Sequence, residues 1–228
     1  MRWIPTNPAA PLKAPKIDED YKVPVVAFSP DEITRILKAC GSNEYLRTFN
    51  LVMRYSGLAT VDAVKLGPDR LEGSHLKLYR TRTGTWVKVL LPPVIVERLK
   101  ALPVKSGGGW FWNRKGNESD HQTATGNMRR MLRPIFKEAK VYRKDKEGKK
   151  MLDETGKPRH GHPYQWRHTF VNEQLIGGAD FPRIAELLGD KPSTVQDTYA
   201  HFVAGRQKPL DETVKKSWDK DELEGFRL

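Results

Sequence analysis

The deciding stretch of the sequence is Tyr164-Gln165-Trp166-Arg167-His168-Thr169-Phe170, and Tyr199 follows it 32 residues after Arg167. Arginine binds phosphate oxygens through a planar fork of N–H donors. A tyrosine hydroxyl can attack a phosphorus atom and form a covalent ester with it. An arginine that enters a helix, followed by a tyrosine in a polar segment, is therefore suited to attack on a phosphodiester.

The overall charge favours a nucleic acid as partner. The chain has 228 residues, with 40 Lys and Arg against 28 Asp and Glu, and its formal net charge is +12. Such a domain can release counterions from a polyphosphate, although a basic surface can also serve only for solubility. A single cysteine, Cys40, argues against an internal disulfide and a cysteine-rich metal site. No apolar run approaches the roughly 20 residues that cross a bilayer, so we expect a cytoplasmic protein without a membrane partner.

The first part of the chain divides into a linker and the start of a domain. Five prolines within residues 1–27 predict an extended linker. Ser29, Pro30 and Glu32 have the spacing of an N-cap, a first helical residue and a capping box. The apolar face of this helix continues to Cys40, which is therefore expected in the core.

The remaining patterns predict a mainly α domain with a small antiparallel β-sheet (α+β). Residues 75–82 and 86–91 alternate between apolar and polar side chains, and Thr83-Gly84 between them can form the turn of a β-hairpin. Apolar periodicity and stop signals predict helices at 43–56, 60–66, 93–102, 122–139, 166–176, 181–188, 193–203 and 208–218. We therefore expect one domain over 28–218, with a C-terminal tail at 219–228.

Residues 141–163 form a basic insertion with two glycines, Gly148 and Gly156. The segment predicts either an extended β-hairpin that lies along DNA or a mobile solvated loop, and the loop is the favoured alternative. His160 and His162 have a spacing that could bind a metal. Because neither Cys nor a carboxylate constellation accompanies them, we expect neither metal nor cofactor.

The order of motifs near the C-terminus is similar to that of a known family. Arg167-His168-Thr169-Phe170, then Leu187-Leu188-Gly189, then Tyr199-Ala200-His201 resembles the catalytic domain of tyrosine recombinases, or phage integrases. The resemblance covers nearly all of residues 28–218 and is strongest over 162–206. It implies that the chain has the fold of this catalytic domain, binds duplex DNA and assembles with copies of itself on DNA. It also implies strand cleavage through a 3′-phosphotyrosyl intermediate, without a metal or nucleotide.

Of the six main positions of the family's catalytic set, only two are retained, and a third has arginine in place of lysine. The resemblance assigns Tyr199 as the nucleophile and Arg167 as the second family arginine, which grips a non-bridging oxygen. Arg82, in Thr81-Arg82-Thr83-Gly84, stands where the family has a hairpin lysine. Arginine binds phosphate well, but its high pKa makes it a poor proton donor.

Three further positions depart from the family. Ala59 stands where the first arginine is expected and supplies no donor. Tyr164 and Asp190 occupy the two histidine positions, of which the second is sometimes tryptophan in the family. Tyr164 can still bond to a phosphate. An ionised Asp190 repels a phosphate unless Lys191 or Arg82 compensates its charge.

These observations support two functions from different classes. The leading hypothesis is an integrase of mobile DNA in which Tyr199 attacks, Arg167 and Arg82 stabilise charge, and water or Tyr164 protonates the leaving oxygen. His201 either helps to deprotonate Tyr199 or has only a packing role. The alternative is a cleavage-deficient DNA-binding or architectural protein on the same fold. An RNA- or nucleotide-binding protein is disfavoured, because a glycine-rich phosphate loop and an aromatic RNA-binding motif are missing.

Overall fold

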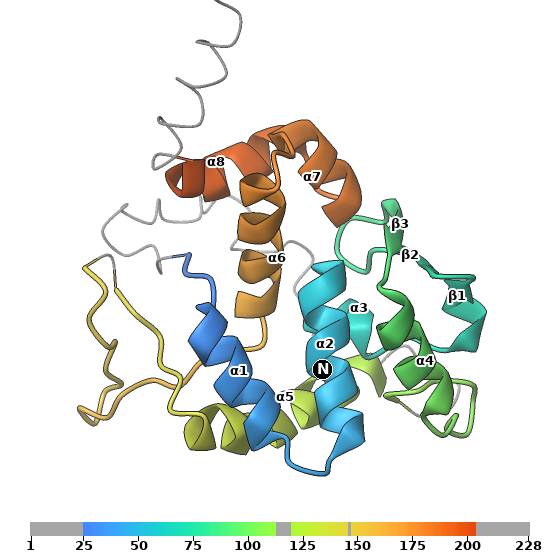
Figure 1. Cartoon of the computed structure of the whole chain (residues 1–228), viewed down its shortest axis with the longest axis horizontal. Helices are drawn as coiled ribbons and strands as arrows, with labels where there is room; N and C mark the ends of the chain where they lie inside the picture. Colours follow the sequence, from blue (N-terminus) through green and yellow to red (C-terminus); the bar gives the residue numbers. More distant parts are fainter. Residues whose placement is uncertain (1–24, 113–119, 146, 204–228) are drawn as a thin grey trace, which may run out of the picture.

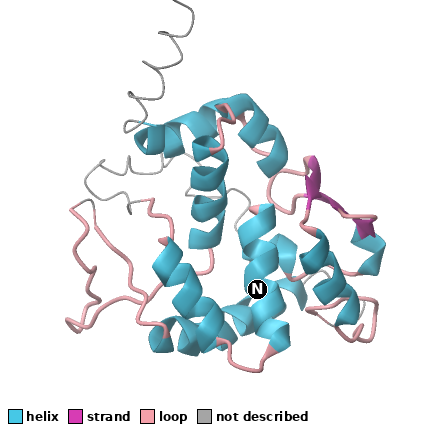
Figure 2. Cartoon of the chain, viewed as in Figure 1, coloured by secondary structure: helices cyan, strands magenta, loops and turns pink. Residues whose placement is uncertain are grey.

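The computed structural model describes residues 25–112, 120–145 and 147–203, and this part is mostly helical with one small antiparallel sheet (Figure 2). It confirms the predicted α+β class. Most of the predicted linker, the predicted helix at 208–218 and the tail at 219–228 lie outside the described residues. Within the described ranges, no helix is long and apolar enough to span a bilayer.

The helices follow the predicted order, with small shifts at their ends. They are α1 (Pro30–Ala39), α2 (Glu44–Ser56), α3 (Thr60–Ala63), α4 (Pro93–Ala101), α5 (Asp120–Glu138), α6 (Gln165–Ile176), α7 (Phe181–Leu188) and α8 (Pro192–Val203), with a 3₁₀ turn at Pro68–Arg70. Figure 1 shows α6 in the middle of the molecule, α7 and α8 across one of its ends, and the sheet on the side opposite the 141–163 segment.

The start of α1 has the predicted capping box. Ser29 Oγ accepts a hydrogen bond from the Glu32 amide at 3.2 Å, and Glu32 Oε2 accepts one from the Ser29 amide at 2.9 Å. Cys40, which caps the other end of the helix, is buried in the core as expected. The local sequence therefore defines both ends of this helix.

Two hydrophobic clusters meet along α6. The larger one joins α1, α2, α4, α5 and the sheet, and it includes Trp166, whose indole N–H donates to Asn50 Oδ1 at 2.8 Å. The smaller one joins α6 to α7 and α8 and includes Phe170 and Tyr199. Helix α6 therefore presents residues to both clusters, and Tyr199 reaches the junction from the smaller one.

The sheet has the strand order β1-β2-β3, with antiparallel pairs throughout. Its strands are β1 (Leu71–Glu72), β2 (His75–Tyr79) and β3 (Trp86–Leu90). The predicted hairpin is present, but β2 ends at Tyr79 instead of continuing to Arg82. The cause is tertiary: Asp62 Oδ1 accepts hydrogen bonds from the Thr81 amide at 2.8 Å and from Thr81 Oγ1 at 2.7 Å. These bonds direct the chain out of the ladder and toward α3.

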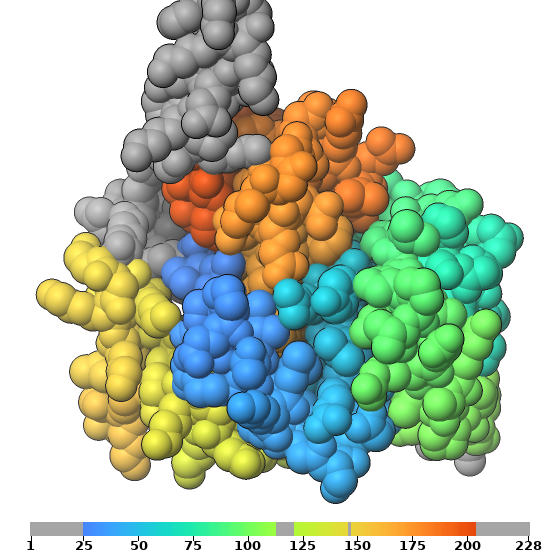
Figure 3. All heavy atoms as spheres, in the orientation of Figure 1, coloured from blue at the N-terminus to red at the C-terminus, as the bar shows by residue number. Residues whose placement is uncertain are grey.

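The 141–163 insertion is a hydrogen-bonded unit, closer to the hairpin alternative than to the favoured solvated loop. Three short segments form a closed ring of backbone hydrogen bonds. The Arg143 amide donates to the Arg159 carbonyl, the Arg159 amide donates to the Met151 carbonyl, and the Met151 amide donates to the Arg143 carbonyl. Isolated antiparallel bridges join the same segments. Figure 3 shows this insertion as a lobe beside α1, and an ion pair between Lys144 and Glu32 at 2.9 Å connects the two.

The insertion is built on an eight-residue repeat. Asp145 and Asp153 occupy equivalent positions, and each Oδ1 accepts backbone amides of its own turn at 2.8–3.1 Å. Gly148 and Gly156 follow three residues later with φ of 81° and 77°, a left-handed conformation that favours glycine. The two turns therefore have the same local cause, an Asp-x-x-Gly-Lys sequence.

Gly189, which ends α7, offers a test of how the hairpin packs on that helix. Its φ is 63°, and a Cβ there would lie 2.8 Å from both Arg80 Cγ and Val87 Cγ1. Gly73 has a similar φ of 58° with nothing within 4 Å of its Cβ position. We expect Gly73→Ala to lower the free energy of unfolding by about 1 kcal/mol through backbone strain alone. Gly189→Ala should lower it by about 1–3 kcal/mol more through overpacking.

Urea unfolding of the two variants measures this difference. Equal losses of unfolding free energy for Gly189→Ala and Gly73→Ala would contradict the close packing of the hairpin on the end of α7.

Candidate active site

Arg167 lies at the centre of the site. It is the third residue of α6, and only 1% of it is exposed. Its Nη1 donates to the Gly57 carbonyl at 2.8 Å, and its Nη2 lies 3.5 Å from the Leu188 carbonyl. Those carbonyls belong to the C-terminal ends of α2 and α7, where the helix dipole is negative and favours a cation. The position of the guanidinium is therefore determined by two helix ends.

Asp190 completes the environment of Arg167. Its Oδ2 lies 2.5 Å from Arg167 Nη2, and the Asp190 amide donates to the Ala185 carbonyl in the cap of α7. The charge of Asp190 is thus compensated by Arg167, and not by Lys191 or Arg82 as the sequence suggested. The carboxylate also occupies a donor with which Arg167 could hold a phosphate.

Tyr199 is buried, and its hydroxyl lies 3.0 Å from Nδ1 of His168. Burial raises the pKa of the Tyr199 hydroxyl above its usual value, and the nearby Arg167 acts in the opposite direction. Burial, followed by the charge of Arg167, lowers the pKa of His168 to about 3. His168 is therefore neutral at pH 7 and can accept the hydroxyl proton in a hydrogen bond.

The structure brings a different histidine to the Tyr199 hydroxyl than the one considered from sequence. His201 is exposed, and its Nε2 lies 3.0 Å from the Val25 carbonyl. Because residues two positions apart on a helix point in different directions, His201 does not share the face of Tyr199 on α8. His168 reaches the hydroxyl from α6, so only the tertiary fold identifies it.

The hairpin also contributes a different arginine than predicted. Arg82 is exposed in the β2–β3 turn, whereas Arg80 is 6% exposed and its Nε lies 3.0 Å from Asp62 Oδ2. Asp62 is itself buried in α3. The electrostatic neighbours of Arg80 include Arg167 and Asp190, so Arg80 is the hairpin arginine that faces the site.

Ala59 lies at the N-cap of α3 and makes no side-chain capping bond. Ala59 is partly exposed, and Tyr164, at the N-cap of α6, is exposed. The Tyr164 ring meets His168 edge-on, with 5.1 Å between ring centroids. Of the five residues predicted for the site, the structure therefore brings Arg167, Asp190, Tyr164 and Tyr199 together and leaves Arg82 exposed.

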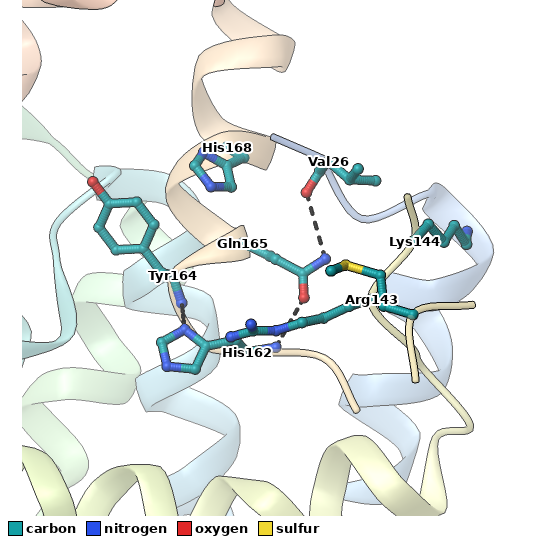
Figure 4. Close-up of a pocket in the computed structure, with 8 residues that line it drawn as sticks. Val26, Arg143, Lys144, His162, Tyr164, Gln165 and His168 are labelled. Carbon is teal, nitrogen blue, oxygen red and sulfur yellow. Dashed lines mark hydrogen bonds between the residues drawn. The ribbon is translucent and has the colours of Figure 1, made fainter. Parts of the chain in front are cut away.

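A cavity of about 320 Å³ adjoins the site between α6 and the insertion (Figure 4). Tyr164 and His168 are shared by the site and the cavity, and Arg143 and Lys144 line it from the insertion. Burial, followed by the charges of Arg143 and Arg129, lowers the pKa of His162 in this wall to about 4. Within the described residues, no group of three or more His, Cys, Asp or Glu side chains is arranged to hold a metal ion.

The lowered pKa of His168 predicts an acid-dependent loss of stability. The folded-state pKa is about 3 against an ordinary 6.5, so the unfolded chain binds more protons between these values. The free energy of unfolding therefore falls as the pH decreases through 6.5 toward 3. The unfolding free energy of the wild type decreases between pH 7 and pH 5. We expect this decrease to be smaller by up to about 2 kcal/mol in His168→Gln.

Urea unfolding at both pH values measures this contribution, and the exposed His201 provides the control. His201→Gln should leave the wild-type pH dependence in place. An undiminished loss in His168→Gln would contradict the burial of a neutral imidazole against Tyr199.

Comparison with solved structures identifies the fold. The chain is similar to XerA recombinase, with a TM-score of 0.56 and 19% identity over 91% of this chain and 68% of that one. It is also similar to the catalytic domain of bacteriophage HP1 integrase, with a TM-score of 0.53 and 18% identity over 85% and 95% of the two chains. A third similar structure is XerH site-specific recombinase bound to difH substrate in a pre-cleavage complex. Its TM-score is 0.54 and its sequence identity is 17%, over 83% of this chain and 54% of XerH.

The similarity lies in the fold and not in overall sequence. No protein-family model matches the chain, and no curated protein matches its sequence. The order of helices around a three-stranded antiparallel sheet nevertheless matches these catalytic domains. The chain therefore has the catalytic-domain fold of the tyrosine recombinases and integrases, as its motifs predicted.

Proposed function

We propose that this chain binds duplex DNA as the catalytic domain of a site-specific recombinase or integrase of mobile DNA, acting in the cytoplasm. The observation that carries the proposal is the convergence of Tyr199, His168 and Arg167 in one buried site of a recombinase fold. The net charge of +12 favours the same partner. Among the structural neighbours, lambda integrase is described as a tetramer bound to a Holliday junction and as a dimer bound to a core site, which supports assembly on DNA.

The proposed reaction is attack of the Tyr199 oxygen on a backbone phosphorus. A bond forms between that oxygen and phosphorus, and the bond from phosphorus to the 5′-oxygen breaks, leaving a 3′-phosphotyrosyl ester. Nδ1 of His168, 3.0 Å from this hydroxyl in the described state, is an acceptor placed to take the proton as the bond to phosphorus forms. Arg167 stabilises the negative non-bridging oxygens, and the 5′-oxygen takes a proton from water or Tyr164. The step needs no oxidant, metal or nucleotide.

The described state requires a rearrangement before this reaction. Tyr199 is 3% exposed, and Asp190 holds Arg167 Nη2 at 2.5 Å. A DNA phosphate must therefore replace the Asp190 carboxylate on Arg167, and the Tyr199 hydroxyl must turn toward the phosphorus. Binding of DNA is thus expected to supply the free energy that opens the site.

The second candidate is a DNA-binding protein on the same fold that does not cleave. The ion pair between Asp190 and Arg167 and the methyl side chain of Ala59 favour it, because both reduce the donors available to a phosphate. This alternative keeps the DNA partner and removes only the covalent step.

Covalent trapping separates the two candidates. A pool of nicked duplexes with a randomised central region serves as substrate, because the short fragment beyond the nick diffuses away and religation stops. We expect wild-type chain to form a denaturant-resistant adduct with part of the pool. Tyr199→Phe should abolish it, since the attacking oxygen is lost. Tyr45→Phe, which removes a hydroxyl bonded to the Phe111 carbonyl, should retain it.

Adduct formation by Tyr199→Phe would refute Tyr199 as nucleophile. Duplex binding by the wild type, without an adduct to any member of the pool, would leave the non-cleaving alternative.

Asp190 provides a test of the closed state. Asp190→Asn removes the charge that competes with phosphate for Arg167, so we expect affinity for a mixed-sequence duplex of about 30 base pairs to rise roughly tenfold. The free energy of unfolding should fall, because a buried guanidinium loses its partner. Asp197→Asn, at an exposed position of α8, removes the same charge elsewhere and should change affinity less.

Fluorescence anisotropy at fixed salt measures both affinities. Equal gains for Asp190→Asn and Asp197→Asn would show that only net charge matters, and would contradict competition at Arg167.

A further inference from the structure

Arg80 has a buried N–H donor that no other described residue accepts. The residue is 6% exposed, and its Nε is paired with Asp62 at 3.0 Å. Its Nη1 is buried without a hydrogen-bond partner among the described residues. A buried guanidinium N–H without an acceptor is costly and rare in native structures. The unpaired donor therefore points to an acceptor that joins when a ligand binds.

The surroundings place Arg80 in the site around Arg167. Burial lowers the pKa of Arg80, and the charge of Arg167 lowers it further. The charges of Asp62 and Asp190 raise it. The stem of Arg80 passes against Gly189, where a Cβ would lie 2.8 Å from Arg80 Cγ. Gly189 directly precedes the aspartate that pairs with Arg167, so both arginine side chains approach the C-terminal end of α7.

The buried carboxylate of Asp62 binds both Arg80 and the residue that follows it. Asp62 Oδ2 holds Arg80 Nε, while Asp62 Oδ1 accepts the amide and the hydroxyl of Thr81. Asp62 belongs to the short helix that begins after Ala59, and its own amide donates to the Ala59 carbonyl. The β2–β3 hairpin thus holds the guanidinium of Arg80 in a fixed position beside α3, whose N-cap is Ala59 and not an arginine.

From this geometry we infer that Arg80, and not Arg82, binds the scissile phosphate beside Arg167 and supplies the donor that Ala59 lacks. The inference rests on the proposed function, because the ligand is the phosphate that Tyr199 attacks. Two guanidinium groups then face one phosphate, each held from behind by protein oxygens. Such donors act without reorganisation when charge develops in the transition state.

The competing interpretation is a structural ion pair between Arg80 and Asp62. Arg80→Lys separates the two roles, because lysine keeps the charge beside Asp62 but lacks the planar fork that includes Nη1. We expect this variant to fold, as judged by urea unfolding, and to form the adduct with the nicked-duplex pool about 10²-fold more slowly. Arg82→Lys should slow it less, and Arg98→Lys, on the distant α4 where Arg98 pairs with Glu44, should not slow it.

A rescue variant adds a result that a structural role would not produce. Ala59→Arg in the Arg80→Lys background introduces a guanidinium at a partly exposed position of the same site. We expect it to recover at least about tenfold of the lost rate. Unchanged adduct formation in Arg80→Lys, or a larger loss in Arg82→Lys, would overturn the inference while strand cleavage by Tyr199 stands.

Phosphate binding by Arg80 can also be measured if the wild type forms no adduct. That result removes strand cleavage, and duplex binding then decides the role of Arg80. Loss of one phosphate contact in Arg80→Gln should reduce the slope of log affinity against log salt concentration by about 0.9, with Arg98→Gln unchanged. An unchanged slope for Arg80→Gln would overturn phosphate binding by Arg80.

Discussion

The buried guanidinium of Arg167 is the interaction on which the rest of the site depends. Burying a charge is costly unless it is paired and hydrogen-bonded. Here the cost is offset by the carbonyl of Gly57, the carbonyl of Leu188 and the carboxylate of Asp190. These acceptors come from the ends of two helices packed against α6. Arg167 therefore connects helices of the two hydrophobic clusters. The same guanidinium binds phosphate in the proposed reaction.

This arrangement explains how a basic site remains folded without DNA. Asp62 pairs with Arg80, and Asp190 pairs with Arg167, so each buried cation has a buried or half-buried anion. The Tyr199 hydroxyl rests against a neutral His168 in the same environment. A phosphate that enters can take over the role of the Asp190 carboxylate. In the proposed reaction, the release of Arg167 from Asp190 and the attack by Tyr199 are therefore separate steps.

Local patterns predicted the elements, whereas tertiary contacts determined the site. The capping box of α1 follows from Ser29 and Glu32, because both partners lie within four residues. Local patterns could not predict that Arg80, and not Arg82, faces the site. This position depends on Asp62, which binds Arg80 and Thr81 at the start of the hairpin turn. The Asp-x-x-Gly-Lys turns of the insertion repeat in the sequence itself, whereas the ring of backbone bonds that joins its segments depends on tertiary contacts.

Mass spectrometry of the chain after incubation with the nicked-duplex pool shows whether Tyr199 attacks DNA. Nuclease and protease digestion would leave a nucleotide remnant on any tyrosine that had attacked DNA. We expect this remnant on the peptide that contains Tyr199. A remnant on another residue, or duplex binding with no modified peptide at all, would contradict it.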